Sequence, residues 1–347
     1  MSEKSSIKVL MLSAAYTGSV GGVARHVVTL SRALLQVNNV SVQVVTLAKP
    51  GDPEKLQRRG RLGEWKLKRQ TVDEFSGRRA VFGRLFELLA ADWFRIRPTL
   101  IHAHDFDSLV LGSMLRCAFN LPLVVTVHRA PTEWRPLRFR ESAKDCLLEF
   151  SRNHSLVDAV VVPSVASARV LKDQGFDDVV TIPHAIGKHL LSYESDSTLL
   201  GNLGVPAHRR VVFCPVRPDE HKDPYVVLRG AARLKKTEGE IPFFLLLDDQ
   251  ENPEVSQELR AIASAYNLEE GMDLGFVLPF TYGQELATAF RAADLVVVPS
   301  VAESFGQSVL DAFMFAKPVI ARNSMALREL IRHGENGLLV RGVGDPS

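Results

Sequence analysis

Short runs of consecutive apolar residues recur along the whole chain and alternate with longer amphipathic stretches. In the first half these runs cover residues 7–13, 41–48, 99–105, 122–128, 158–164 and 178–184. In the second half they cover residues 210–216, 242–249, 274–280, 294–300, 318–323 and 337–342. Helix-like stretches such as residues 23–36 and 225–236 lie between them. Apolar strands that alternate with helices predict an α/β protein whose parallel sheets are covered on both faces.

One heptapeptide occurs almost unchanged in both halves. The segment "DAVVVPS" covers residues 158–164 and "DLVVVPS" covers residues 294–300, and each precedes a helix-like stretch. Chance similarity of two buried strands is one explanation. The matched context favours two similar doubly wound domains. Weak periodicity with Gly, Ser and Pro breaks over residues 187–210 places the predicted boundary there, giving domains 1–190 and 191–347.

The bulk composition narrows the class of protein. The chain has 347 residues, 46% of them hydrophobic, with a mean hydropathy of +0.03, which is typical of a soluble globular protein of two domains. The formal net charge of +2 indicates no particular partner. Apolar runs stay well below the roughly 18 residues of a membrane span. Residues 9–15 resemble a signal peptide, but the Gly-rich turn and helix that follow favour a buried strand.

Cysteine usage predicts the redox compartment. The three cysteines, Cys117, Cys146 and Cys214, lie far apart and form no C-x-x-C pair. We interpret them as buried thiols in a reducing compartment, which agrees with a cytoplasmic location.

Glycines follow the first predicted strand. In an open parallel sheet, ligands bind outside the carboxyl ends of the strands, so residues that follow strands are the candidates for a site. Gly18, Gly21 and Gly22 precede a helix and would let a backbone approach an anion closely. A plain tight turn explains these glycines equally well.

Histidines end two of the predicted strands. His102 and His104 in "IHAHD" share one face of a strand, which makes a metal-dependent hydrolase the main rival interpretation. His128, His154 and His184 are scattered along the sequence, and no further His/Asp cluster has ligand spacing, so we expect no metal site. His128 either lines a pocket at its strand end or is a satisfied core histidine.

Cations follow a strand in the second half. Arg217 and Lys222 lie five residues apart after the run at residues 210–216. The planar fork of Arg and the point charge of Lys suit a diphosphate. Since Asp219, Glu220 and Asp223 are interleaved, a solvated charged loop is the alternative.

Two acids flank a predicted helix start in "SVAESFGQSVLDAFMFAKPVIA", residues 300–321. Gly306 allows close approach, and the free N–H groups at the start of the helix favour phosphate. Glu303 precedes this position, and Asp311 lies roughly 8 Å further along the helix axis. Carboxylates accept hydrogen bonds from vicinal hydroxyls, so the stretch predicts a site for a nucleoside diphosphate sugar.

The chain resembles the retaining GT-B-fold glycosyltransferases that carry the E-x(7)-E motif, known as glycosyl transferases group 1, family 4. Nearly the whole chain takes part, and four segments carry the resemblance: "PSVAESFGQSVLDAFMFAKPVIA", "GENGLLV", the spacing from "VR" to Lys222, and "GGVARH". It implies two facing Rossmann-like domains with an intervening cleft. Residues 1–190 would bind the acceptor, and residues 191–347 would bind the nucleotide sugar.

The resemblance also implies a role for each site residue. Glu303 would contact hydroxyls of the donor sugar, and Asp311 would take the place of the second Glu, which holds the ribose. Arg217 and Lys222 would hold the diphosphate. The remaining contacts would come from the helix start, from the first domain's glycines and from a histidine of the sugar pocket: Phe305, Gly306, Gln307, Ser308, Gly21, Gly22 and His128.

The sequence departs from the family pattern at several positions. Asp311 is one methylene shorter than the usual Glu, and Met325-Ala326 replaces the usual Gly-Gly. His184-Ala185 replaces Asn-Gly, and Val216 replaces Gly. Relatives continue through further helices beyond the point where this sequence ends. A non-catalytic partner subunit with the same fold, and a nucleotide-sugar epimerase or hydrolase, therefore remain alternatives.

The implied reaction is transfer of a sugar to an acceptor hydroxyl with retained configuration, without a metal or a cofactor. The expected acceptor is a glycan, a lipid or a small molecule. Basic residues with aromatics, over residues 55–84 and 133–140, suit peripheral contact with an anionic membrane at its inner face, and a solvated charged surface is the alternative. We expect no nucleic-acid partner, because no recognised nucleic-acid motif is present.

Overall fold

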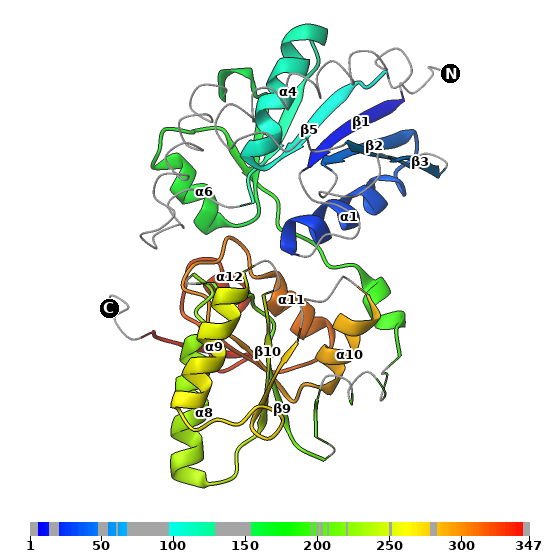
Figure 1. Cartoon of the computed structure of the whole chain (residues 1–347). Helices are drawn as coiled ribbons and strands as arrows, with labels where there is room; N and C mark the ends of the chain where they lie inside the picture. The colour runs from blue at the N-terminus through cyan, green and yellow to red at the C-terminus, as the bar shows by residue number, and fades with distance from the viewer. Residues whose placement is uncertain are drawn as a thin grey trace. The chain divides into compact units, whose positions relative to one another are not determined.

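A computed structural model describes residues 6–13, 21–47, 55–59, 62–67, 97–128, 154–194, 196, 198, 201, 204–206, 208–219, 221–249, 252–277 and 283–342 (Figure 1). These residues form two compact units, one that runs up to Ala185 and one that starts at Ile186. The sequence had suggested a boundary between residues 190 and 191. Each unit is a β-sheet covered by helices.

The first unit contains an eight-stranded sheet in the order β3-β4-β2-β1-β5-β6-β7-β8. Its strands are β1 (Ile7–Ser13), β2 (Val40–Leu47), β3 (Lys55–Arg59), β4 (Leu62–Leu67), β5 (Leu100–His104), β6 (Leu123–Thr126), β7 (Ala159–Val162) and β8 (Val179–Thr181). Its helices are α1 (Gly22–Leu34), α4 (Asp105–Phe119), α6 (Val165–Lys172) and the short η3 (His154–Leu156). Neighbouring strands are parallel except β3, which pairs antiparallel with β4.

A hairpin of β3 and β4 lies within the first predicted basic stretch, residues 55–84. Residues 55–59 and 62–67 pair in antiparallel register at the edge of the sheet. The sequences "KLQRR" and "LGEWKL" do not predict strands, because they carry charged residues where a buried strand would carry apolar ones. Charges on an edge strand oppose pairing with other chains. The rest of the two predicted basic stretches, including residues 133–140, lies outside the described residues.

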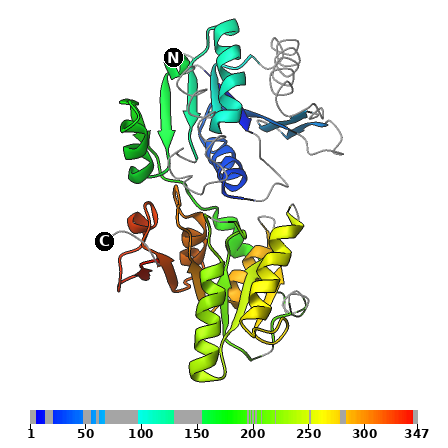
Figure 2. The same cartoon turned by 60° about the vertical axis from the view of Figure 1, so that its left-hand side comes forward.

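The two faces of the first sheet are covered by different helices. Leu10 and Leu12 of β1 pack in one apolar cluster with residues of α4 and α6. Val9 and Met11 of the same strand pack in a second cluster with Val27 of α1. Because successive side chains of a strand point to opposite faces, this alternation defines a doubly wound sheet. Figures 1 and 2 show α1 and α4 flanking the sheet.

The second unit contains six parallel strands in the order β11-β10-β9-β12-β13-β14. The strands are β9 (Val211–Cys214), β10 (Phe243–Leu247), β11 (Leu274–Val277), β12 (Leu295–Val298), β13 (Val319–Arg322) and β14 (Leu338–Val340). The helices are η4 (Lys188–Ser192), α8 (Tyr225–Glu238), α9 (Pro253–Ala265), α10 (Gln284–Ala292), α11 (Gln307–Met314) and α12 (Leu327–Leu330). α8 and α9 lie side by side (Figures 1 and 2). The twelve predicted strands are confirmed, as is the predicted architecture of two doubly wound domains.

The repeated heptapeptide occupies the same structural place in both units. The Asp158 carboxylate accepts a hydrogen bond from the backbone N–H of Leu123, the first residue of β6, at 2.7 Å. The Asp294 carboxylate accepts one from the N–H of Val211, the first residue of β9, at 2.8 Å. In each unit the aspartate therefore ties its own strand to the start of the neighbouring strand.

The described cysteines only partly match the prediction of buried thiols. Cys214 is buried in the second core, and burial raises the pKa of its thiol to about 12. Cys117 is exposed near the end of α4, where the prediction was wrong, because that helix end turns one side toward solvent. Within the described ranges, every helix is too short or too polar to cross a lipid bilayer.

Candidate functional site

The second sheet changes its winding direction between β9 and β12. The chain moves from β9 outward to β10 and β11, then returns to β12 and continues outward to β13 and β14. In such sheets the loops after the two central strands diverge and leave a crevice at their carboxyl ends, where ligands bind. Arg217 and Lys222 follow β9, and Glu303 follows β12. The structure therefore places these three predicted residues on the loops that border one switch point.

Lys222 and Glu303 form an ion pair across this switch point. The Lys222 Nζ atom lies 2.6 Å from Glu303 Oε1, and the Ser300 hydroxyl donates to the same oxygen at 2.9 Å. The two side chains are 20% and 13% exposed, so the pair is accessible yet largely enclosed. Arg217 is exposed and lies on the same loop as Lys222. The sequence reasoning missed Ser300, whose only signal was its position at the end of the repeated heptapeptide.

Backbone hydrogen bonds hold the two loops together. The N–H groups of Val301 and Ala302 donate to the carbonyl of His221 at 2.8 and 3.4 Å. Asp219 accepts from the N–H of Lys222 at 3.1 Å and contacts His221 Nδ1 at 3.0 Å. The predicted acidic residue Asp219 therefore shapes the loop, which fixes the position of the lysine next to Glu303.

The helix start after Glu303 depends on a glycine. Gly306 has φ +94°, in the left-handed region, and precedes the first residue of α11. A Cβ atom at this position would lie 2.6 Å from Cδ2 of the fully buried Leu327. Phe305 is buried, and the Ser308 hydroxyl donates to the carbonyl of Pro215 at 3.3 Å. Gln307 begins the helix, where the first N–H groups have no acceptor within the helix itself.

Asp311 occupies a different environment from Glu303. Its side chain is fully buried in the second turn of α11, beside the buried residues Val309 and Ala312. The Glu303 side chain is 13% exposed, so a ligand can reach its carboxylate more easily than that of Asp311. A contact between Asp311 and a ribose, as the family resemblance implies, requires rearrangement of the atoms that cover the carboxylate. The substituted residues Val216 and Ala326 are buried as well, and Met325 is half-buried.

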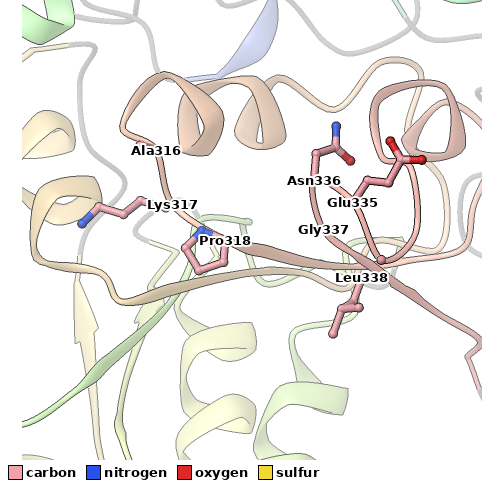
Figure 3. A pocket seen from close by; sticks show the side chains of 8 residues that line it. Ala316, Lys317, Pro318, Glu335, Asn336, Gly337 and Leu338 are labelled. Atoms are coloured by element: carbon pink, nitrogen blue, oxygen red, sulfur yellow. The ribbon is translucent and has the colours of Figure 1, made fainter.

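A hollow of about 450 Å³ lies at the other edge of this sheet. It is lined by residues just before β13 and by residues just before and at the first position of β14: Ala316, Lys317, Pro318, Gly334, Glu335, Asn336, Gly337 and Leu338 (Figure 3). Because these residues stand at the amino ends of the strands, the hollow is separate from Lys222 and Glu303. The Lys317 ammonium group donates a hydrogen bond to the carbonyl of Arg291 at 2.8 Å. Lys317 therefore makes a structural contact.

The first sheet has its switch point between β1 and β5. α1 begins there at Gly22, and the preceding Gly21 has φ +120°, so both predicted glycines stand at a helix start beside the central strand. Gly18 lies outside the described residues. His102 and His104 end β5, and their ring centroids lie 4.3 Å apart, which confirms that they share a face.

Histidines that are scattered in the sequence meet at this edge of the first sheet. His104 Nδ1 lies 3.0 Å from His128 Nε2, and His128 Nδ1 lies 3.2 Å from His184 Nε2. His26 of α1 stacks on His184 with ring centroids 4.1 Å apart. The expectation that no further cluster joins His102 and His104 is therefore wrong. Spacing along the chain carried no signal, because four different segments supply the rings. The side chain of His154 is outside the described set.

Two protein-family profiles together match nearly the whole chain. The profile described as Glycosyltransferase Family 4 matches residues 20–187, and the profile described as Glycosyl transferases group 1 matches residues 198–346. The chain belongs to this family of glycosyltransferases. The resemblance inferred from the motifs is thereby confirmed.

Relatives and solved structures agree with this membership. D-inositol 3-phosphate glycosyltransferase of Thermobispora bispora is 29% identical over 255 residues, which are 71% of this chain and 59% of the relative. The protein of that name from Corynebacterium aurimucosum is 25% identical over an alignment of 343 residues that covers 93% of this chain and 80% of the relative. The chain thus spans about six tenths of the Thermobispora relative.

Two solved structures share the fold. Sucrose-phosphate synthase from Thermosynechococcus elongatus superposes with a TM-score of 0.79 at 22% identity, over 96% of this chain and 85% of the other. HepE of Anabaena, solved in complex with UDP and glucose, superposes with a TM-score of 0.72 at 21% identity, over 96% and 86% of the two chains. The predicted GT-B fold of this chain is confirmed.

Proposed function

We propose that this protein transfers a sugar from a nucleoside diphosphate sugar to an acceptor hydroxyl with retention of the anomeric configuration. The observation that carries the proposal is the Lys222–Glu303 pair, 2.6 Å apart, at the switch point of the second sheet. A cation for phosphate and a carboxylate for hydroxyls stand together there, beside the start of α11. These are the two recognition elements that a nucleotide sugar needs.

The positive charge of the site would act on the leaving diphosphate. As the bond to the sugar breaks, negative charge grows on the diphosphate. Lys222, Arg217 and the first N–H groups of α11 would stabilise that charge in place, which lowers the barrier without a metal at this position. Among the described residues of the loops after β9 and β12, we identify no enzyme nucleophile for the anomeric carbon. The departing phosphate itself would then help to deprotonate the acceptor, as the family resemblance implies.

Within the donor, Glu303 would contact sugar hydroxyls and Asp311 the ribose. The pairing of Glu303 with Lys222 and Ser300 fixes its carboxylate, so one carboxylate oxygen is already oriented by two donors. His128 and the two glycines Gly21 and Gly22 would contribute from the first unit.

The acceptor proposed here is a small polyol or sugar that carries a phosphate. The support comes from relatives named D-inositol 3-phosphate glycosyltransferase, whose name specifies such a compound. We assign acceptor binding mainly to the first unit. A glycan or lipid acceptor remains in the panel below, because the basic stretches that suggested one lie largely outside the described residues.

A donor and acceptor panel tests the function. The full chain would be mixed with UDP-, GDP- and ADP-linked sugars, and thermal stabilisation would identify the donor, since a ligand of the folded state raises Tm. Proton NMR of the product with inositol phosphate, a glycan or a lipid acceptor then reads the anomeric configuration. We expect one donor class to stabilise the protein and the product to retain configuration. An inverted product, or a folded protein that no donor stabilises, would refute the proposal.

Variants of the two acids test the assigned roles. Glu303→Gln should impair transfer and leave affinity for the plain nucleoside diphosphate nearly intact. Asp311→Asn should weaken the nucleoside diphosphate by about 1–3 kcal/mol, the contribution of one charged hydrogen-bonding group, while Asp311→Glu should be tolerated. Circular dichroism serves as the folding control for the buried site. Unchanged affinity in Asp311→Asn with lost affinity in Glu303→Gln would reverse the roles.

A further inference from the structure

The first unit gathers imidazole rings at one edge of its sheet. His26, His102, His104, His128 and His184 come from α1, from the end of β5 and from the segments after β6 and β8. Centroids of the His104 and His128 rings lie 5.3 Å apart, and those of His26 and His128 lie 5.0 Å apart. The group stands at the switch point between β1 and β5, which is where a doubly wound sheet places its ligands.

Burial keeps four of these rings neutral. Desolvation lowers the pKa of His26 to about 4, and desolvation together with the nearby His26 lowers the pKa of His102 to about 4. Desolvation, followed by the influence of His26, lowers the pKa of His184 to about 2. His104 is 1% exposed, and its pKa also falls well below 6.5 for the same reasons. A neutral imidazole keeps one lone pair, and this is the form that binds metal ions.

Two ring nitrogens of the group lack a hydrogen-bond partner among the described residues. They are Nε2 of His26 and Nε2 of His104, and both atoms are buried. A buried polar atom without a partner is costly, so its presence calls for an explanation such as a bound ion. In the absence of a metal ion, the Nδ1–H of His104 can donate to Nε2 of His128, and the lone pair of His104 then stands on the partnerless Nε2. Metal binding by both rings replaces this contact: Nε2 of His128 gives its lone pair to the ion, while its Nδ1 keeps the hydrogen bond to His184.

The spacing of three of the rings fits one metal ion. One ring nitrogen each from His26, His104 and His128 lies within 4.8 Å of the other two. In a tetrahedral site with bonds of about 2.0–2.1 Å, ligand nitrogens stand roughly 3.4 Å apart. Small side-chain rotations therefore bring the three nitrogens into range. A ligand set of imidazoles alone selects Zn²⁺ and neighbouring transition metals over Mg²⁺ or Ca²⁺, which prefer oxygen.

We propose that His26, His104 and His128 bind one divalent transition-metal ion, represented by Zn²⁺, at the switch point of the first unit. His184 orients His128 through the hydrogen bond at Nδ1, as outer partners of metal-binding histidines do. Three protein ligands leave a fourth position for water or for an oxygen of a small molecule. This site goes beyond the proposed transfer reaction, whose charged donor-binding groups, Arg217, Lys222 and Glu303, lie on the second unit.

Metal titration of the full chain, purified without a histidine tag and stripped with a chelator, tests the proposal. Calorimetry with Zn²⁺ should give one ion per chain, and Co²⁺ should give the intense visible absorption of tetrahedral coordination. His26→Gln, His104→Gln and His128→Gln should each weaken Zn²⁺ at least about 100-fold, more than loss of an outer partner typically costs. His208→Asn, at an exposed histidine of the second unit, is the matched control and should bind as wild type does.

The outcomes separate this proposal from the transfer function. Absence of saturable Zn²⁺ binding in folded wild type, an octahedral Co²⁺ spectrum, or wild-type affinity in His104→Gln would each overturn the site. If a variant fails to fold, the proposal is judged from the wild-type protein alone, by its Co²⁺ spectrum and by the number of Zn²⁺ ions that it binds per chain. Nucleoside diphosphate affinity is measured on the same samples, so failure of the metal site and failure of the donor site give different results.

Discussion

The two sheets of this protein use the same architecture to present opposite kinds of chemistry. At the switch point between β1 and β5, the first unit collects buried neutral imidazoles, which offer lone pairs without formal charge. Between β9 and β12, the second unit sets Lys222 against Glu303 near the surface, with Arg217 exposed on the same loop as Lys222. The strand order decides where a ligand binds, and the residues just after the strands decide which ligand it is.

The repeated heptapeptide also combines a shared structural role with a difference at its last residue. Asp158 and Asp294 make equivalent hydrogen bonds to neighbouring strands. The final serines differ, because the Ser164 hydroxyl accepts from the N–H of Ser167 at the start of α6, whereas Ser300 donates to Glu303. The heptapeptide thus has the same structural role in both units, whereas its final serine makes a different contact in each.

Loss of a cation at the second switch point should have the largest effect. Lys222→Ala and Arg217→Ala should each lower turnover roughly 100- to 1000-fold, because the leaving diphosphate loses one positive group. Steady-state kinetics with the donor identified by the panel measures this.

Lys235→Ala is the matched control for that experiment. Lys235 pairs with Asp273 at the same 2.6 Å distance, but the pair lies before β11, at the other edge of the sheet. Its removal should leave turnover unchanged. If Lys222→Ala lowered Tm as much as Lys235→Ala and left turnover alone, the Lys222 pair would be structural.

The helix starts at the two switch points should differ in their tolerance of a side chain. Both Gly306 and Gly21 have positive φ, but a Cβ at Gly306 also meets Leu327, whereas a Cβ at Gly21 meets no described atom within 4 Å. Gly306→Ala should therefore reduce the free energy of unfolding by roughly 2–4 kcal/mol, and Gly21→Ala by about 1–2 kcal/mol. Denaturant unfolding measures both, and equal losses would contradict the account.

Acid should destabilise the first unit more than the second in metal-free protein. The unfolded chain protonates these histidines below about pH 6.5, while the folded unit resists protonation of His26 and His102 until about pH 4. Stability is therefore present above pH 6.5 and falls as pH drops from 6.5 toward 4, by on the order of 1–3 kcal/mol per histidine. Hydrogen exchange, corrected for intrinsic rates, should show lost protection first in β1 and β5. Earlier loss in β9 and β12 would contradict this.

The paired aspartates should give the smallest and most equal effects. Asp158→Ala and Asp294→Ala each remove one hydrogen bond to a strand N–H, so each should cost about 1–2 kcal/mol. The ion pair of Asp158 with Arg116 adds little, because the aspartate side chain is 43% exposed. Thermal unfolding of both variants checks this, and a clear difference between them would mean that the repeat is not structurally equivalent.

The sequence was sufficient for the framework and for the placement of Arg217, Lys222 and Glu303 on two neighbouring loops. Apolar runs specify buried parallel strands directly, and the loops after β9 and β12 lie adjacent as soon as the strand order is known. The hairpin of β3 and β4 was missed because an edge strand needs no apolar run. The histidine group was missed because His26 and His184 approach His104 only through tertiary packing. The full burial of Asp311 likewise depends on packing around α11, which residue spacing does not reveal.

The central claim is that affinity for the nucleoside diphosphate depends on Lys222 at the second switch point and not on the histidine group at the first. Calorimetric titration of UDP, GDP and ADP into wild type, Lys222→Ala and His104→Gln tests it most directly. The account predicts that at least one nucleoside diphosphate binds wild type, that Lys222→Ala weakens it about 10-fold or more, and that His104→Gln leaves the affinity unchanged. Absence of binding by all three at millimolar concentration, or affinity lost in His104→Gln and kept in Lys222→Ala, would contradict it.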